Sequence, residues 1–200
     1  MAMVTRKKSD LEKIYPRDSE TKSFIIQAAV NQYNDIFNEL DPAPFKKRDI
    51  NQELKDYLED CSLDIPLRYN VILQFSIPKS ARDHEKEKSI ESGLKTYFSF
   101  LMKSLEKNLK RSYQKNFIYI ITAFVLLLTA SFTGTFIGTK DVILFTLVQG
   151  LYIGGWVFLW EAISSFSFYN RDIKYEYRQY KRFYNAPIYF KNMHHKKDSV

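Results

Sequence analysis

The sequence has few of the residues on which catalytic and redox chemistry depends. Cys61 is its only cysteine, so the chain can form no internal disulfide and nothing points to an oxidising compartment. Its six glycines lie mostly between residues 134 and 155, and it has three histidines. It contains no glycine-rich phosphate loop, no Ser-His-Asp or Cys-His set and no metal-ligand spacing. We therefore expect neither an enzyme nor a bound metal or cofactor.

Charge is missing from one long stretch and nearly missing from a second, although the whole chain carries a net charge of +7. The run Phe117–Ile137 is apolar, and as a helix it would cover roughly 30 Å, the thickness of a bilayer core. The second run, 142–169, holds a single charge, Glu161. We predict two transmembrane helices, 117–137 and 142–169, joined by a short external loop, 138–141. A buried soluble hairpin is the less favoured alternative.

Lysine and arginine flank this apolar block on both sides. The juxtamembrane basic residues are Arg111 and Lys115 before the block and Arg171 and Lys174 after it. Such flanks stay in the cytoplasm, and the N-terminus lacks the apolar core of a signal peptide. We therefore predict a multi-pass protein of the cell inner membrane, with the lipid bilayer as a partner and both termini cytoplasmic. Direct nucleic-acid binding, the other meaning of a basic chain, is the minority interpretation.

Small and polar residues recur on one face of the second span, because residues 3, 4 or 7 apart share a helix face. The predicted pore or interhelix stripe consists of Thr146, Gly150, Gly154, Glu161 and Ser164. In lipid, small residues mark places where helices approach closely. Trp156 and Trp160 are expected to anchor the span at the membrane interface.

Glu161 allows two interpretations, because a carboxylate within a membrane helix needs a partner or water. In the first it lies near the cytoplasmic interface, solvated or paired with Arg171 or Lys115. In the second, copies of Glu161 form a ring around the pore of a homo-oligomer and favour cations.

The soluble parts complete the predicted fold class, a membrane α-helical hairpin with a small α+β cytoplasmic domain and a helical stalk. A polar N-terminal segment (1–21) precedes the cytoplasmic domain (22–79), and a basic stalk helix (80–116) leads to the first span. The apolar spacing of residues 22–40 predicts an amphipathic helix, and Asp49 is the expected N-cap of a second one.

Residues 67–77 alternate between apolar and polar side chains, which predicts a half-buried strand. One strand cannot satisfy its own backbone, so it needs a partner. Ala186–Met193 is the other candidate strand, at the end of a helix and tail over 170–200. We therefore predict that this tail returns to pair with residues 67–77, in the same chain or in a neighbour.

The stretch from Gly150 to Glu161 resembles a prokaryotic family of two-span membrane proteins without an assigned activity. Many members show a Gly-Trp-Val-x-x-Trp pattern, matched here by Gly155, Trp156, Val157 and Trp160, and the resemblance covers roughly residues 45–185. In size and layout the chain is also similar to small membrane effectors of bacterial anti-phage defence. The resemblance implies a protein that opens or disrupts the membrane when a cytoplasmic sensor detects infection.

The leading functional hypothesis is a homo-oligomeric channel or membrane-perturbing effector, gated by its cytoplasmic domain and acting in bacterial defence. Two spans cannot enclose a water path, so further copies of the chain are expected partners. The alternative is a membrane anchor or adaptor that recruits a cytoplasmic partner protein. A third option is a regulator that senses lipid, or a small nucleotide or oligonucleotide ligand, through the basic juxtamembrane residues.

Overall fold

The computed structural model describes residues 8–136 and 142–193 and divides into two compact units. The first, called the sheet unit, comprises the described residues up to Lys103 and those from Tyr177 onward. The second, called the hairpin unit, is Ser104–Glu176. The predicted external loop, 138–141, lies outside the described residues.

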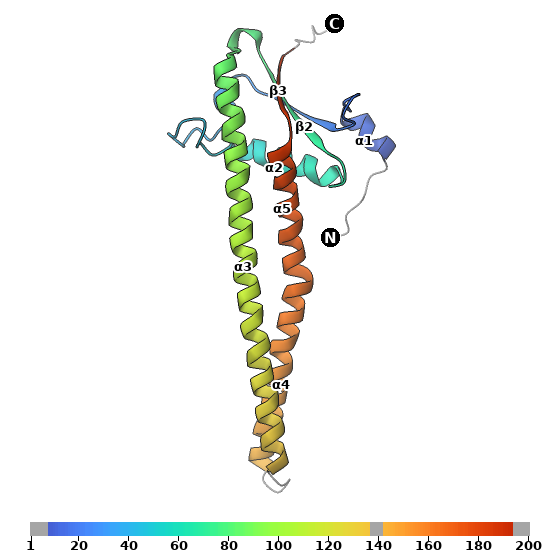
Figure 1. Ribbon diagram of the computed structural model, residues 1–200, viewed down its shortest axis with the longest axis vertical. Helices are drawn as coiled ribbons and strands as arrows, with labels where there is room; N and C mark the ends of the chain where they lie inside the picture. Colours follow the sequence, from blue (N-terminus) through green and yellow to red (C-terminus); the bar gives the residue numbers. More distant parts are fainter. Residues whose placement is uncertain (1–7, 137–141, 194–200) are drawn as a thin grey trace. The chain divides into compact units, whose positions relative to one another are not determined.

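Three parallel strands form the centre of the sheet unit, in the order β1 (Phe24–Ala29), β2 (Val71–Ile77) and β3 (Ile188–Asn192) (Figure 1). Every residue of β2 except Ser76 is buried, including those on both faces of the strand. Parallel sheets are covered on both faces, which explains why the central strand is apolar. The prediction of a half-buried strand over residues 67–77 was therefore wrong in extent, because β2 begins at Val71 and only Ser76 is not buried.

The C-terminal tail returns to the sheet, as predicted, and it does so within one chain. β3 pairs with β2 in a parallel register that places Leu73 opposite Ile188 and Phe75 opposite Phe190. The rings of Phe75 and Phe190 stack with their centroids 5.6 Å apart. Segments more than a hundred residues apart in sequence are thereby joined in one core.

The prediction of an amphipathic helix over residues 22–40 is wrong. The structure has β1 at Phe24–Ala29, followed by a 3₁₀ turn, η1 (Tyr33–Ile36). The consecutive aromatic and β-branched residues at the start of this segment suit a strand, and β2 supplies the pairing partner along its whole length. Leu40, which the helical spacing placed on the buried face, is 90% exposed.

Two helices precede β2 in the sheet unit. α1 (Lys8–Ile14) buries Leu11, so the N-terminal segment predicted as polar contributes to the core. α2 (Gln52–Asp64) is capped by Asn51, whose side chain accepts a hydrogen bond from the Glu53 backbone N–H at 2.8 Å. The predicted cap, Asp49, is two residues too early. A short 3₁₀ turn, η2 (Lys79–Ala81), follows β2.

The remaining helices run on past the predicted spans, as their apolar periodicity indicated. α3 extends from His84 to Phe136 without a break. After the loop come α4 (Val142–Ser164), a π-helical turn η3 (Ser165–Tyr169) and α5 (Asn170–Asn185). In the sheet unit, Phe98 of α3 stacks on Phe183 of α5, with ring centroids 5.3 Å apart.

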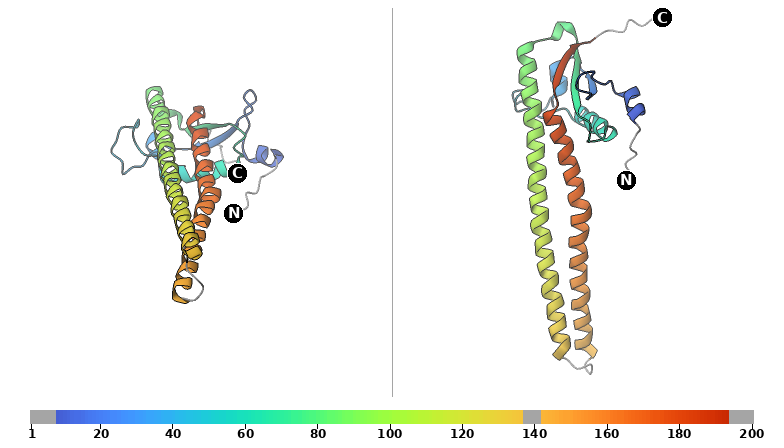
Figure 2. Two further views of the ribbon diagram at one scale, coloured as in Figure 1. Left: turned by 60° about the horizontal axis from the view of Figure 1, so that its bottom comes forward. Right: turned by 45° about the vertical axis from the view of Figure 1, so that its right-hand side comes forward.

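The hairpin unit consists of the second half of α3 lying alongside α4, η3 and the start of α5 (Figures 1 and 2). Both helices are long and apolar enough to span a membrane. Only 11% of the most apolar stretch of each helix is buried. The core helix of a soluble protein would bury most of its apolar residues, so the exposure of this pair is unlike that of a soluble core.

Candidate functional site

A seam of small residues joins the two helices of the hairpin unit. The buried positions are Ala123 and Ala130 on α3 and Val148, Gly155 and Ala162 on α4. They recur at seven-residue intervals, the spacing that keeps one helix face against its neighbour. The helices approach closely at Gly155, because a Cβ atom there would come within 2.6 Å of the Leu127 Cγ and 3.3 Å of the Ala123 carbonyl oxygen.

The π-helical turn η3 shifts this seam by one residue. Continuing the seven-residue interval from Ala162 leads to Tyr169, which is 54% exposed, whereas Asn170 is only 2% exposed. A π-helical turn holds about one residue more than an α-helical turn, so η3 brings Asn170 onto the seam in place of Tyr169. No feature of the sequence identified this shift.

Beside this turn, the seam becomes polar. Ser112, Asn116 and Asn170 are all buried. Among the described residues, Asn116 Nδ2 and both side-chain polar atoms of Asn170 are buried without a hydrogen-bond partner. Buried polar atoms are usually paired. With the Tyr175 hydroxyl, these amides are the buried polar groups without a partner in the described part of the hairpin unit.

The predicted stripe lies on the side of α4 away from this seam. Thr146 and Gly150 are exposed, and a Cβ atom on Gly150 would meet nothing within 4 Å. Gly154 is half-buried, and a Cβ atom there would lie 3.6 Å from Leu126, an ordinary contact. Thr146 and Gly150 therefore take no part in the interface with α3 inside one chain, whereas Gly155 lies within it. Whether the stripe faces a pore or a second chain stays a prediction.

The end of the stripe opens into a pocket of about 450 Å³, here called the juxtamembrane pocket. Its lining residues are Asn108, Arg111, Ser112 and Lys115 on α3 and Glu161, Ser164, Ser165, Phe168 and Tyr169 on α4 and η3. The structure thus brings together two residues of the predicted stripe and two of the predicted juxtamembrane basic residues. One small space holds two cations, one carboxylate and several hydroxyl groups.

Ring contacts fix the level of this pocket along the hairpin. Tyr119 lies against Phe158 with centroids 5.7 Å apart, and Tyr113 lies against Phe166 at 6.3 Å. Glu161 falls between Phe158 and Phe166 on its helix, so it lies level with the part of α3 between Tyr113 and Tyr119. The basic run of α3 ends there and its apolar run begins.

The electrostatics of the pocket link Glu161 to Lys115. The pKa of the Lys115 amine is raised, first by a hydrogen bond with Tyr119 and further by the negative charge of Glu161. The Lys115 amine also lies 5.3 Å from the centre of the Tyr119 ring. Of the partners predicted for Glu161, Lys115 shares its pocket, whereas Arg171 does not line it.

The other predicted site residues lie outside the pocket. Trp156 and Trp160 are exposed, at 64% and 72%. Lys174 lies over the ring of Tyr113 at 5.8 Å, and Arg171 is exposed. These four side chains occupy the surface of the hairpin unit and form no common site with Glu161.

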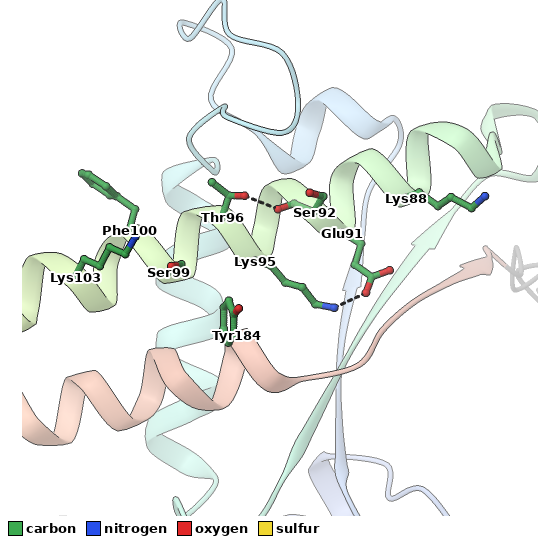
Figure 3. Close-up of a pocket in the computed structure, with 9 residues that line it drawn as sticks. All are labelled: Lys88, Glu91, Ser92, Lys95, Thr96, Ser99, Phe100, Lys103 and Tyr184. Carbon is green, nitrogen blue, oxygen red and sulfur yellow. Dashed lines mark hydrogen bonds and ion pairs between the residues drawn. The ribbon is translucent and has the colours of Figure 1, made fainter.

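A second cavity, of about 580 Å³, lies in the sheet unit between α3 and Tyr184 (Figure 3). It is basic in composition, but its lysines are partly neutralised. Lys95 is paired with Glu91 at 2.6 Å and Lys88 with Glu85 at 3.2 Å. Of its three lysines, only Lys103 lacks a carboxylate partner among the described residues.

A buried carboxylate secures the start of α3 in the sheet unit. Glu87 accepts hydrogen bonds from the Arg82 guanidinium at 2.8 and 3.0 Å and from the Tyr33 hydroxyl at 3.0 Å. The Asp83 backbone N–H in turn donates to the Tyr33 hydroxyl oxygen at 2.9 Å. The sequence pattern did not reveal this cluster, because residues 80–116 were predicted only as a basic stalk helix.

No protein-family model, curated protein or solved structure matches the chain. In the part of the chain that the structure describes, no three His, Cys, Asp or Glu side chains are grouped as a metal site.

Proposed function

We propose that the protein crosses a bilayer as a two-helix hairpin, assembles with further copies of itself, and acts as a channel or membrane-perturbing effector. The sheet unit and both chain ends lie on the cytoplasmic side in this proposal. The basic residues at one end of the hairpin unit, Arg111 and Lys115 on α3 with Arg171 and Lys174 after α4, support that orientation.

The observation that carries the proposal is the unequal use of the glycines on α4. Gly155 has a clear role within the chain, because any side chain there would meet Leu127. Gly150 has none, since a Cβ atom would meet nothing within 4 Å. In lipid, an exposed small residue gives α4 a place where a helix from a second chain can approach closely.

The neighbouring threonine supports the same face. The Thr146 hydroxyl donates to the Val142 carbonyl oxygen at 2.7 Å, so its polar hydrogen is satisfied inside its own helix. This arrangement lets Thr146 lie against another helix without an unpaired donor. With Gly150 one turn further on, the exposed face is both small and free of unpaired donors.

Opening or closing would be controlled through α3. This helix belongs to both units, and in the sheet unit the Arg82–Glu87–Tyr33 cluster holds its first turn. A ligand or protein that binds the sheet unit can bias the assembly only by binding one of its states more tightly.

A cysteine cross-linking experiment tests the assembly. Cys61 is buried and burial raises the pKa of its thiol, so it is a poor background nucleophile, and Cys61→Ser removes it altogether. In membranes we expect Thr146→Cys to give disulfide-linked dimers under mild oxidation. Val148→Cys, two residues away and buried against α3, serves as the control and is expected to stay monomeric.

Ion flux in liposomes tests the activity of the assembled protein. We expect Gly150→Leu to abolish both Thr146→Cys cross-linking and flux, because the side chain fills the space a second helix needs. Cross-linking that is equal at Thr146 and Val148 would contradict the assembly. Absence of flux under every activating condition would contradict the channel.

The anchor or adaptor remains the second candidate, and the parallel sheet favours it. β3 is an edge strand, and an edge strand offers unpaired backbone groups to a partner protein. The other edge, β1, is partly covered within the chain, because the Ile25 N–H donates to the Pro16 carbonyl oxygen and the Tyr57 hydroxyl donates to the Gln27 carbonyl oxygen, each at 2.8 Å. This function predicts that an unrelated two-span hairpin can replace residues 104–176 without loss of activity. The channel proposal predicts complete loss in the same exchange.

A further inference from the structure

We propose that the juxtamembrane pocket binds the headgroup of an aminophospholipid, with Arg111 and Lys115 on the phosphate and Glu161 on the ammonium group. This inference rests on the proposed membrane insertion, and it adds a ligand class and a site to it. Its support comes from the charges of the pocket, its size and its level along the hairpin.

The cationic side of the pocket suits a phosphodiester. Arg111 and Lys115 lie one helical turn apart on α3, so their charged ends reach the same space. An arginine fork can bind two phosphate oxygens at once, and lysine adds a compact charge. Ser164 and Ser165 on the opposite wall supply hydroxyl donors for the remaining oxygens.

The acidic side suits a primary amine. Glu161 is an acceptor-only group when ionised, and it faces the same space as the two cations. A phosphate alone would be repelled by this carboxylate. A headgroup that carries an ammonium group a few bonds from its phosphate can pair with the two cations and with Glu161 at the same time. A choline headgroup cannot donate a hydrogen bond to Glu161, and a glycerol headgroup brings no cation.

The size and level of the pocket fit the same ligand. A volume of about 450 Å³ lies within the usual range of small-ligand sites, roughly 300–1,000 Å³. The pocket lies where the basic run of α3 gives way to its apolar run, which is where headgroups meet a membrane helix. Phe168 and Tyr169 line the pocket and give the lipid's glycerol and upper chains an amphipathic wall.

Lipid retention by the full-length protein tests the site. The protein is reconstituted in nanodiscs of phosphatidylethanolamine, phosphatidylglycerol and phosphatidylcholine in equal amounts, then extracted in mild detergent, and the lipids that stay bound are measured by mass spectrometry. For the wild type we expect retained phosphatidylethanolamine to exceed the other two about tenfold, as one charge-assisted hydrogen bond would produce.

Variants separate the two halves of the site. Glu161→Gln is expected to keep bound lipid but to lose the preference for phosphatidylethanolamine over phosphatidylglycerol. Replacing both Arg111 and Lys115 by glutamine is expected to reduce retention of every phospholipid. Glu106→Gln and Lys107→Gln are matched controls, because both residues are exposed on α3 and neither lines the pocket. These two variants should behave as the wild type does.

The outcomes distinguish this inference from the proposed function. Release of the protein from native membranes by alkaline carbonate would overturn membrane insertion itself. An inserted protein whose bound lipid mirrors the nanodisc composition, or whose preference survives Glu161→Gln, would overturn the headgroup site alone. A last experiment measures binding of soluble phosphoethanolamine. If this compound binds tightly and the protein shows no preference among lipids, the ligand is a free phosphoester and the lipid proposal is wrong.

Discussion

Gly155 on α4 lies so close to Leu127 on α3 that a Cβ atom would come within 2.6 Å of the leucine Cγ. The adjacent Gly154 is different, because its Cβ atom would lie 3.6 Å from the nearest side-chain atom, on Leu126. Two consecutive glycines therefore have different consequences for the hairpin. Gly155 permits a close approach of the two helices, whereas Gly154 mainly lowers the helix propensity of α4.

The first prediction uses this pair. Gly155→Ala is expected to lower the free energy of unfolding by about 1–3 kcal/mol, because Leu127 or the backbone must move to admit the methyl group. Gly154→Ala is expected to be neutral, or to stabilise the helix by up to about 1 kcal/mol. Thermal unfolding in detergent measures both. Equal losses in the two variants would contradict the close approach at Gly155.

Arg182 provides the second prediction. It is buried in the sheet unit, where it donates to the Ile65 carbonyl oxygen at 2.8 Å and to the Ser62 carbonyl and hydroxyl oxygens at 3.0 and 2.6 Å. Lysine cannot reproduce this fork, so Arg182→Lys leaves buried acceptors unpaired. We expect a loss of about 2–3 kcal/mol in the free energy of unfolding, measured by denaturant titration.

Arg178 supplies the control for this change. It lies one turn earlier on α5 and is exposed. Arg178→Lys is expected to change stability by no more than about 0.5 kcal/mol. A similarly small effect of Arg182→Lys would mean that the buried carbonyl groups do not depend on the guanidinium.

The third prediction concerns acid and rests on Glu87. Burial by itself raises the pKa of this carboxyl, but the hydrogen bonds from Arg82 and Tyr33 and the nearby charge of Arg82 and His84 outweigh burial and lower it below 4.5. A carboxyl group whose pKa is lower in the folded than in the unfolded state stabilises the fold at pH values above the unfolded-state pKa. That stability is lost as the pH falls through the folded-state pKa.

Glu87→Gln should therefore destabilise the protein at neutral pH and reduce the further loss of stability below about pH 4.5. Unfolding temperatures measured from pH 7 to about pH 3 give the profile. Asp18, Asp41 and Asp83 also have lowered pKa values, so part of the acid loss remains in the variant. Glu85→Gln, at an exposed position, should leave the profile unchanged. An identical profile for Glu87→Gln and the wild type would contradict the role of this cluster.

The sequence predicted the elements whose patterns are long or strict. The apolar runs in α3 and α4 are long enough to indicate helices, and the largely apolar segment 67–77 indicated a strand. The return of β3 followed from the need of β2 for a partner. β1 was missed because Ile26, Val30 and Tyr33 also fit a helical spacing. Pairing with β2, a contact far along the chain, decides between the two.

The sequence predicted which residue types matter in the hairpin, but it did not predict which of them lie together. An α-helix that is apolar all round does not reveal which face meets its neighbour. Gly150 and Gly154 have the familiar four-residue spacing, yet the single Gly155 lies on the seam with Val148 and Ala162. The juxtamembrane pocket depends on the register between α3 and α4, which follows from how the seam packs.

The fourth prediction tests the register shift at η3. Val148, Gly155 and Ala162 follow one another at seven-residue intervals, but the next buried seam residue, Asn170, comes eight residues later. Deleting Ser167, an exposed residue of the π-helical turn that does not line the pocket, restores the seven-residue interval and lets η3 become α-helical. We therefore expect this deletion to leave the hairpin folded, with an unfolding temperature in detergent within about 5 °C of the wild type.

Deleting the exposed Ile153 is the control. It turns Gly155 and Ala162 by about 100° away from α3, and this variant is expected to lose its cooperative unfolding transition. If both deletions unfolded the protein alike, η3 would be an essential part of the helix rather than one inserted residue.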